Sequence, residues 1–196
     1  MKIRPTPFLI RRAEAADIPR LPSVEARAVK LFDDWIAQTG LTREILDTVT
    51  SVEEFEAARQ RGQLWVAVAA DQEPLGFAIV IILDGLAHLD EIDVIPEHAR
   101  RGIGTALVRA VCEWAAQEEY GKVTLSTFRD VPFNAPFYAR LGFVPVAPEN
   151  LPPEHVELVK GENARGLCVD KRIVMERRTA TQETLRDPTP AAGHHR

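Results

Sequence analysis

The sequence predicts a mixed α/β fold with one central sheet, in which an antiparallel run of strands precedes a parallel pair. Three observations predict it. Strand-like segments separated by turn residues follow one another between residues 63 and 94, one long amphipathic helix comes next, and another strand-like segment follows that helix. Because a long helical connection joins them, the strands on either side of this helix should be parallel. The other helical patterns should flank the sheet.

Composition narrows the class of protein. The chain has 196 residues, of which 45% are hydrophobic and 27% charged, and this is an ordinary globular composition. Its formal net charge is −5, with 24 basic and 29 acidic residues, so it lacks the basic field that binds nucleic acid. We therefore expect no nucleic-acid partner.

Cysteine usage and apolar runs bear on the compartment. Cys112 and Cys168 have no C-x-x-C spacing, and two thiols without a disulfide framework favour a reducing compartment. Met1–Arg12 lacks the apolar core of a signal peptide. The longest apolar run, Phe77–Leu83, is far shorter than the about 20 residues that a membrane helix needs. We expect a cytoplasmic protein without a membrane partner.

The N-terminal third should be mainly helical. Asp17 is placed to cap a helix with Pro19 in its first turn, and the sequence Ser-Val-Glu-Glu from Ser51 is typical of a capping box. The expected elements are a strand at Phe8–Arg12, a helix from Asp17 to about Phe32, a helical stretch from Thr42 and a helix from Ser51 to Gly62.

The rest of the domain alternates strands and helices. Leu151–Gly166 is polar and begins with prolines, so we expect a loop with at most one helical turn. Residues 1–178 should form a single domain, and the polar residues 179–196, with His194 and His195, should be a disordered tail. The expected elements are strands at Gln63–Ala70, Leu75–Leu83, Leu86–Val94, Val123–Phe128, Phe143–Val146 and Val169–Arg178, and helices at Gly102–Glu119 and Asn134–Leu141.

The turn before the long helix has the features of a phosphate site. A strand ends at Val94, and Arg100-Arg101-Gly102-Ile103-Gly104 then opens the helix, with Thr105 in its first turn. Unpaired N–H groups at a helix start favour an anion, and glycines let it approach the backbone closely. The arginines add charge and forked donors.

Two other phosphate motifs fit poorly. A dinucleotide site would have a glycine where Leu107 stands and would follow the first strand, whereas a P-loop would have Gly-Lys-Ser or Gly-Lys-Thr. Taken alone, the turn is also compatible with an ordinary glycine-rich helix start between two solvated arginines.

The segment Ala99–Gly104 resembles motif A of the GNAT superfamily of N-acetyltransferases, Gln/Arg-x-x-Gly-x-Gly/Ala. The resemblance implies that this turn binds the pyrophosphate of acetyl-CoA. It departs at Ala99, where the family usually has Gln or Arg, which removes a side-chain contact and leaves the backbone cradle. It also implies that the preceding strand splays from its parallel neighbour, so that main-chain groups around Asp93, at Ile92 and Val94, bind the pantetheine arm.

A second segment, Asn134–Phe143, resembles the family's motif B. By its residue types, Asn134 should cap a short helix that Gly142 ends. The resemblance adds cofactor contacts by Asn134 and Phe137, and it implies that Tyr138 binds the cofactor and protonates the departing thiolate of CoA. The competing interpretation of Tyr138 is a core aromatic residue. Together the two motifs make the resemblance specific over about residues 60 to 147.

The acceptor amine requires a base, because an alkylamine of pKa about 10 is mostly protonated at neutral pH. Strand alternation places His88, Asp90 and Ile92 on one face and Leu89, Glu91 and Asp93 on the other. The resemblance implies a base at His88 or Asp90. Glu91 is the weaker candidate because it faces away, unless a bulge re-aims the strand. The alternative is that all are surface polar groups of the strand, and Asp33, Asp34 and Trp35 are guesses for an acceptor pocket.

The sequence thus predicts a GNAT-like fold and an N-acetyltransferase that moves an acetyl group from acetyl-CoA to a primary amine on a small molecule or peptide. The expected reaction is direct attack in a ternary complex, without a metal, and a homodimer is expected only by analogy. The alternatives are a non-catalytic acyl-CoA-binding regulatory module, a protein N-terminal or lysine acetyltransferase, and a nucleotide-dependent oxidoreductase.

Overall fold

A computed structural model describes residues 7–179, and the predicted tail from residue 180 lies outside the described residues. The chain forms one seven-stranded sheet of order β1-β2-β3-β4-β5-β7-β6. Among the described strands only β4 and β5 pair in parallel, so the predicted mixed sheet with an antiparallel first half is confirmed. The strands are β1 Phe8–Arg12, β2 Leu64–Ala69, β3 Pro74–Leu83, β4 Leu86–Val94, β5 Lys122–Phe128, β6 Val144–Pro145 and β7 Arg172–Arg178.

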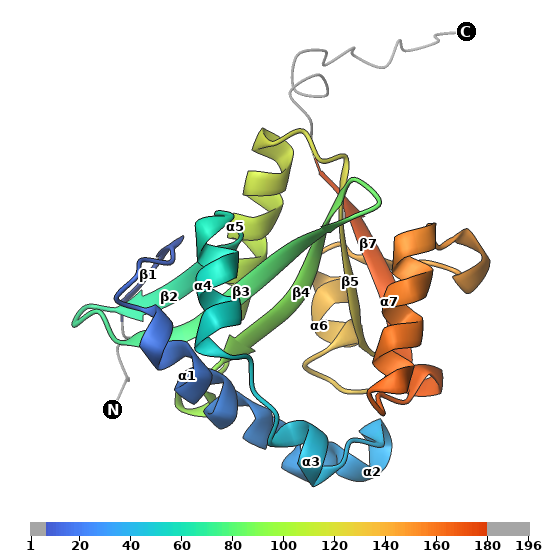
Figure 1. The fold of residues 1–196 in the computed structure, drawn as a ribbon, viewed down its shortest axis with the longest axis horizontal. Helices are drawn as coiled ribbons and strands as arrows, with labels where there is room; N and C mark the ends of the chain where they lie inside the picture. Colours follow the sequence, from blue (N-terminus) through green and yellow to red (C-terminus); the bar gives the residue numbers. More distant parts are fainter. Residues whose placement is uncertain (1–6, 180–196) are drawn as a thin grey trace, which may run out of the picture.

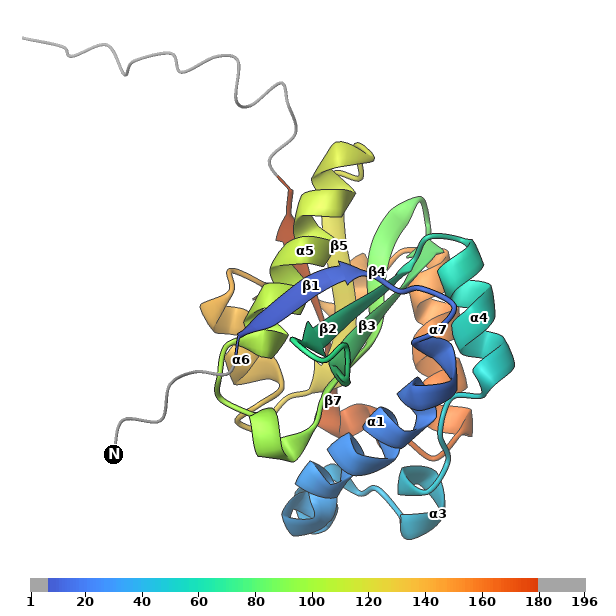
Figure 2. The ribbon, with the colours of Figure 1, turned by 90° about the vertical axis from the view of Figure 1, so that its left-hand side faces the viewer.

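Helices cover both faces of the sheet. Helices α1, α4 and α7 lie on one face, and α5 and α6 lie on the other (Figures 1 and 2). Within residues 7–179 no helix has the length and apolar character to cross a membrane. The helices are α1 Leu21–Ala28, α2 Ile36–Thr39, α3 Arg43–Leu46, α4 Val52–Gln60, α5 Ile103–Gln117, α6 Ala135–Arg140 and α7 Pro153–Ala164, with 3₁₀ segments η1 Ile18–Arg20, η2 Val29–Trp35, η3 Pro96–His98, η4 Pro148–Asn150 and η5 Val169–Lys171.

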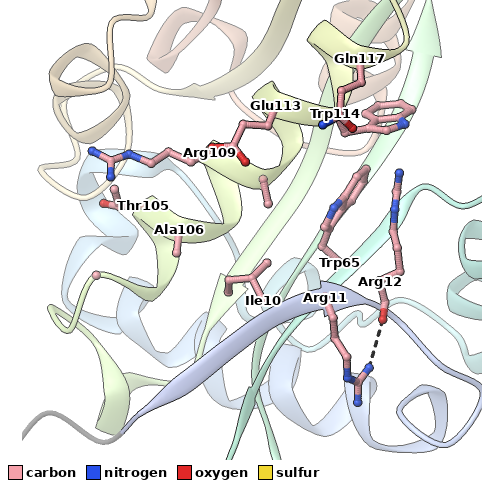
Figure 3. Close-up of a pocket in the computed structure, with 12 residues that line it drawn as sticks. Ile10, Arg11, Arg12, Trp65, Thr105, Ala106, Arg109, Glu113, Trp114 and Gln117 are labelled. Atoms are coloured by element: carbon pink, nitrogen blue, oxygen red, sulfur yellow. Dashed lines mark hydrogen bonds between the residues drawn. The ribbon is translucent and has the colours of Figure 1, made fainter.

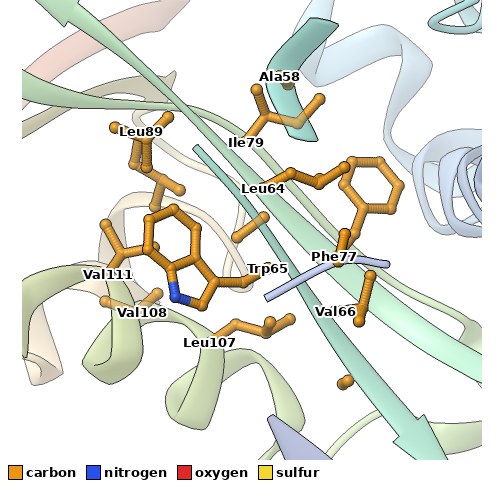
Figure 4. Close-up of a cluster of buried hydrophobic side chains, with 14 of the residues drawn as sticks. Ala58, Leu64, Trp65, Val66, Phe77, Ile79, Leu89, Leu107, Val108 and Val111 are labelled. Carbon is orange, nitrogen blue, oxygen red and sulfur yellow. The ribbon is translucent and has the colours of Figure 1, made fainter. Parts of the chain in front are cut away.

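The hydrophobic core has a layer on each face of the sheet (Figure 4). On the α5 face, Leu107 and Val111 pack towards Trp65 and Leu89. On the α4 face, Phe55 meets Phe77 edge to face, with ring centroids 5.0 Å apart. Helix α5 has its buried residues at the helical spacing that the sequence predicts.

Two N-terminal predictions had different outcomes. The capping box is confirmed, because the Ser51 hydroxyl accepts from the Glu54 N–H and the Glu54 carboxylate accepts from the Ser51 N–H. The prediction that Asp17 caps a helix reaching Phe32 is wrong. Asp17 Oδ2 accepts instead from Arg11 Nη1 at 2.6 Å and from the Glu14 N–H at 2.7 Å. The segment is divided into η1, α1 and η2.

The prediction of a loop at Leu151–Gly166 is also wrong, because α7 occupies most of it. The buried residues of α7 are His155 and Glu162, so its inner face is polar and leaves no apolar stripe in the sequence. Glu162 forms a bidentate pair with Arg172 of β7, with N···O distances of 2.7 and 3.0 Å. Polar contacts with the sheet thus replace the usual hydrophobic contacts of a surface helix.

Candidate active site

The site is formed where β4 and β5 separate (Figure 1). Their pairing is confined to Ala87–Leu89 and Val123–Leu125, although both strands continue. Just beyond β4, the Ile95 N–H donates to the Leu75 carbonyl of β3 at 3.0 Å. Alternate residues of a strand turn their backbone groups to opposite sides, so those of Ile92 and Val94 face β5. These are the residues for which the sequence predicts contacts to a pantetheine arm.

The first turn of α5 lies beside this separation. Gly102 precedes the helix with φ of 86°, a conformation that favours glycine, and Arg100 has φ of 59°. Because a helix start leaves its first N–H groups without intrahelical partners, those of Ile103, Gly104 and Thr105 are available to an anion. Arg100 is exposed and Arg101 half-buried in the turn before them. The predicted phosphate-binding turn therefore has a suitable backbone arrangement.

Gly104 brings this helix start close to α6 and β4. A Cβ added at Gly104 would lie 3.6 Å from Phe137 Cζ and 3.9 Å from Val94 Cγ2. Asn134 does not cap α6 as predicted: its Nδ2 donates to Thr127 Oγ1 on β5 at 2.8 Å. Its Oδ1 is buried without a hydrogen-bond partner. An unsatisfied acceptor beside the separating strands fits an amide N–H donor of the kind that a pantetheine arm carries.

Tyr138 of α6 is buried at the same place. Its ring lies between those of Phe137 and Phe143, at centroid distances of 5.0 and 5.8 Å. Burial raises the pKa of the Tyr138 phenol, and the nearby carboxylate of Asp93 raises it further. The phenol therefore stays protonated at neutral pH, and it is a weaker acid than a solvated phenol. Its packing serves the core as well, so both predicted roles of Tyr138 are compatible with its position.

A bulge changes the faces of β4. Ile79 pairs with Glu91 and the next residue, Val80, pairs with Leu89, which leaves Asp90 as the extra residue. The predicted alternation is therefore wrong beyond Leu89. Glu91 shares the α1 side of the sheet with His88, since it bonds to a loop packed there, and Asp93 follows it two residues later. Asp90 is exposed at the bulge.

Carboxyl groups gather on this face. Thr50, in the loop before α4, donates from Oγ1 to Glu91 Oε2 at 3.2 Å and from its N–H to both oxygens of Glu25, on α1, at 3.0 and 2.9 Å. The carboxyls of Glu25 and Glu91 are also within hydrogen-bonding reach of each other. Asp93 Oδ2 is buried without a partner. We call Glu25, Glu91 and Asp93 the carboxyl cluster.

Burial changes the titration of this cluster. It raises the pKa of Glu91 well above the usual range, and the charges of Asp93, Glu25 and Asp90 add to the shift. Burial and the charge of Glu25 raise the pKa of Asp93 to about 8. Burial also raises the pKa of Glu25, although the hydrogen bonds from Thr50 lower it in part. Protonated Asp93 therefore predominates at neutral pH, and the carboxyls of Glu25 and Glu91 are more basic than solvated carboxyls.

His88 lies in a different environment. It is 1% exposed, and its Nδ1 is 2.9 Å from Thr124 Oγ1, which is 2.9 Å from His155 Nε2 on α7. His155 Nδ1 is 2.7 Å from Asp84 Oδ2 in the β3–β4 turn. Burial, with the charges of His155 and Arg172, lowers the pKa of His88 to about 3. This chain joins α7 to β4 and β5, and it leaves His88 a weak base.

The guessed pocket residues separate into two groups. Asp33 and Asp34 are exposed, and Asp33 pairs with Arg43 at 2.7 Å. Trp35 belongs to an aromatic group, since its ring contacts that of Phe133 at a centroid distance of 6.2 Å. Sequence reasoning missed Glu25 and Thr50 entirely, because nothing in their local patterns marks them.

A separate groove of about 650 Å³ lies between β1 and the outer side of α5 (Figure 3). Arg12 stacks over Trp65 in it, with Cζ 3.7 Å from the ring centroid. The groove shares Gly102 and Thr105 with the phosphate-binding turn, but its lining includes no residue of β4, β5 or α6. It therefore lies away from Tyr138 and from the carboxyl cluster.

Filling the space at Gly104 tests the helix start. We expect Gly104→Val to weaken CoA binding about tenfold or more, because the side chain would fill the space that Phe137 and Val94 border beside the helix start. Titration calorimetry measures the dissociation constant. Gly161→Val is the matched control, since Gly161 lies in α7 with nothing within 4 Å of an added Cβ. Equal affinity for CoA in the two variants would contradict this assignment.

The pKa of Asp93 predicts a stability change with pH. Its folded pKa of about 8 lies above the unfolded value of about 3.9. Protonated Asp93 therefore contributes stability below about pH 4, and this contribution is lost as the pH rises through about 8. Relative to that of the native chain, we expect the free energy of unfolding of Asp93→Asn to rise by about 2 kcal/mol or more as the pH goes from 5 to 8.

Urea unfolding at the two pH values measures this gain. Asp71→Asn, in the exposed β2–β3 turn, is the control and should show little change with pH. A pH-independent difference for Asp93→Asn would show that Asp93 is ionised in the folded protein.

Fold and site together define a protein with a glycine-rich helix start beside a separated parallel strand pair, which is the arrangement of acetyltransferases. A family model described as the acetyltransferase (GNAT) family matches residues 28–143. The chain belongs to this family of acetyl-CoA-dependent acyltransferases.

Individual relatives are more distant. The chain is 30% identical over 78 residues to the uncharacterized N-acetyltransferase YobR of Bacillus subtilis, a match that covers 39% of this chain and 32% of that protein. The matched part thus spans about a third of that relative's length.

Solved structures share the fold. The PaiA N-acetyltransferase of Thermoplasma acidophilum, in complex with coenzyme A, has a TM-score of 0.67 at 18% identity, covering 88% of this chain and 99% of that one. The N-acetylglutamate synthase of Neisseria gonorrhoeae, complexed with coenzyme A and N-acetyl-glutamate, has a TM-score of 0.65 at 16% identity, covering 88% of this chain and 35% of that one.

Proposed function

We propose that this protein transfers the acetyl group of acetyl-CoA to a primary amine by direct attack in a ternary complex. One observation carries the proposal: the free helix start at Gly102–Gly104, the backbone of Ile92 and Val94, Tyr138 and the carboxyl cluster all surround the separation of β4 and β5. The complexes of PaiA and of the Neisseria synthase with coenzyme A support the choice of co-substrate.

The chain's own groups divide the work of holding the co-substrate. The N–H groups of Ile103, Gly104 and Thr105, with Arg100 and Arg101 nearby, bind the pyrophosphate. Main-chain groups of β4 and the free Oδ1 of Asn134 bind the pantetheine arm. Phe137 closes the space beside Gly104.

Tyr138 is proposed as the acid. The amine nitrogen attacks the thioester carbonyl, the new C–N bond forms, and the C–S bond breaks. As the C–S bond breaks, the sulfur takes the phenolic proton, so that CoA leaves as the thiol, and the phenolate then regains a proton from solvent. Because its pKa is raised, the phenol is fully protonated before the reaction begins.

Glu91 is proposed as the base that takes the amine proton, in place of His88 and Asp90. The bulge turns Glu91 to the face of the carboxyl cluster, and its raised pKa makes it more basic than a solvated carboxylate. His88 has a pKa of about 3 and its Nδ1 engages Thr124. Asp90 lies on the exposed bulge.

Release of free thiol from acetyl-CoA in the presence of an amine panel tests the proposal. We expect thiol release that depends on the amine, together with one equivalent of acetylated amine by mass spectrometry. CoA binding without turnover of any small amine or peptide would favour a regulatory module. Turnover of peptides alone would favour a protein acetyltransferase.

A further inference from the structure

We propose that α7 is an acid-releasable cover on one face of the sheet, held there by a buried hydrogen-bond chain through two histidines. The proposal concerns the docking of this helix and does not depend on the proposed function. It draws on the polar contacts of α7, on the number of protons that the chain can hold and on the charges around it.

Polar contacts with the sheet hold α7 in place. Its buried residues, His155 and Glu162, are seven residues apart and so lie on one side of the helix. They contact Thr124 and Ser126, which are alternate residues of β5 and point to the same side of the sheet. A helix without a buried apolar stripe gains little from the hydrophobic effect, so these contacts largely determine whether it stays docked.

One of these contacts lies at the edge of the candidate active site. The parallel pairing of β4 and β5 ends at Leu125, so Ser126 is the first residue of β5 beyond it. Ser126 Oγ donates to Glu162 Oε2 at 2.9 Å, and Glu162 also pairs with Arg172 of β7. Release of α7 would therefore uncover the sheet beside the separation of the two strands.

The hydrogen-bond chain orders its protons. His155 Nδ1 lies 2.7 Å from Asp84 Oδ2, and an ionised carboxylate only accepts, so this nitrogen carries a proton. Thr124 Oγ1 is 2.9 Å from a ring nitrogen of each histidine and has a single proton to donate. With both histidines neutral, the Thr124 hydroxyl donates to His155 Nε2 and accepts from His88 Nδ1.

The chain can hold one added proton but not two. If His155 becomes an imidazolium, its Nε2 donates to Thr124, whose hydroxyl then donates to His88 Nδ1, and Asp84 balances the charge. If His88 is protonated as well, both rings donate to Thr124 Oγ1, and the hydroxyl proton has no acceptor in the chain. Two imidazolium rings would also lie 5.4 Å apart in a buried place.

Neighbouring charges do not balance a second imidazolium. Within residues 7–179, Asp84 is the carboxylate in contact with the two histidines, and its own N–H donates to Glu154 of α7. The other charged groups on this side of β5 and β7 already form ion pairs. These pairs are Lys122 with Glu176 and Arg172 with Glu162, each at 2.7 Å.

Acid therefore weakens the docking of α7. Burial and the charges of His155 and Arg172 lower the pKa of His88 to about 3, whereas an exposed histidine has a pKa of about 6.5. The docked state binds fewer protons than the released state between these values. Its stability is fully present above about pH 6.5 and is lost as the pH falls from there towards 3.

Hydrogen–deuterium exchange of the native chain, measured by mass spectrometry, tests the proposal. After correction for the intrinsic exchange rate, we expect the protection of residues 155–164 to fall about tenfold or more between pH 7 and pH 5. The protection of residues 107–117 in α5 should change less than about threefold. Unchanged protection of α7, or an equal loss in both helices, would overturn the proposal.

Removing the titrating group should remove the response. His88→Asn keeps an N–H donor for Thr124 near the position of Nδ1, and we expect the protection of α7 to change less than about threefold between the two pH values. His98→Asn is the matched control, because His98 lies in η3 outside the chain, and it should keep the native response. A native response in a folded His88→Asn variant would overturn the role of His88.

A pair of substitutions at Thr124 tests the shared hydroxyl. Thr124→Val keeps the shape of the side chain without its hydroxyl, and we expect the protection of α7 at pH 7 to fall about tenfold. Thr124→Ser keeps the hydroxyl and should retain most of the protection. Equal protection in the two variants would contradict the chain, and the exchange of the native chain decides the proposal if neither variant folds.

Discussion

Tyr138→Phe is expected to lower kcat by about 10²- to 10³-fold, while the KM for acetyl-CoA changes less than about twofold. The variant loses only the phenolic proton donor and keeps the ring that packs between Phe137 and Phe143. The departing thiolate must then take its proton from water. Steady-state kinetics with varied acetyl-CoA separates kcat from KM.

The second tyrosine of the chain provides the control. Tyr120 contacts Trp114 at a centroid distance of 5.4 Å, at the far end of α5 from the phosphate-binding turn, and Tyr120→Phe should retain activity. Unchanged kcat in Tyr138→Phe would leave Tyr138 as a core aromatic residue without an acid role.

Glu91→Gln is expected to lower kcat/KM about 10²-fold at pH 7. Without a base, the reaction depends on the small fraction of amine that is already neutral in solution. That fraction rises as the pH approaches the amine pKa of about 10, so the deficit should shrink at alkaline pH. A pH–rate profile of the variant against the native chain measures this convergence.

Asp90→Asn distinguishes Glu91 from its sequence neighbour. Asp90 lies on the bulge, so its substitution should leave the shape of the pH–rate profile unchanged. If Asp90→Asn shows the alkaline recovery and Glu91→Gln does not, the base is Asp90 on the bulge, one of the two positions that the family resemblance implies.

The glycine-rich turn and helix α5 were predictable because their signals are local. Gly102 and Gly104 mark the start of α5 directly, and the strands around them carry strong apolar patterns. The parallel pairing of β4 and β5 was predictable from the length of the helical connection between them. These features define the face of the site that we propose holds the co-substrate.

The acceptor face was not predictable in the same way. The bulge at Asp90 arises from pairing between β3 and β4, and a single strand's sequence does not reveal it. Glu25 and Thr50 reach Glu91 from elements far apart in the chain. Helix α7 was missed because its buried positions, His155 and Glu162, look solvent-facing by residue type. Each of these errors concerns a polar contact between distant segments.

The placement of helices on opposite faces of the sheet has a consequence for the order of events. The phosphate-binding turn and α6 lie on one face, while α1 and the carboxyl cluster lie on the other (Figure 2). In the proposed mechanism, a long thiol carrier and a short amine would then arrive from opposite directions and meet at the gap in the strand ladder. Neither molecule would obstruct the route of the other, so we expect no fixed order of entry and departure.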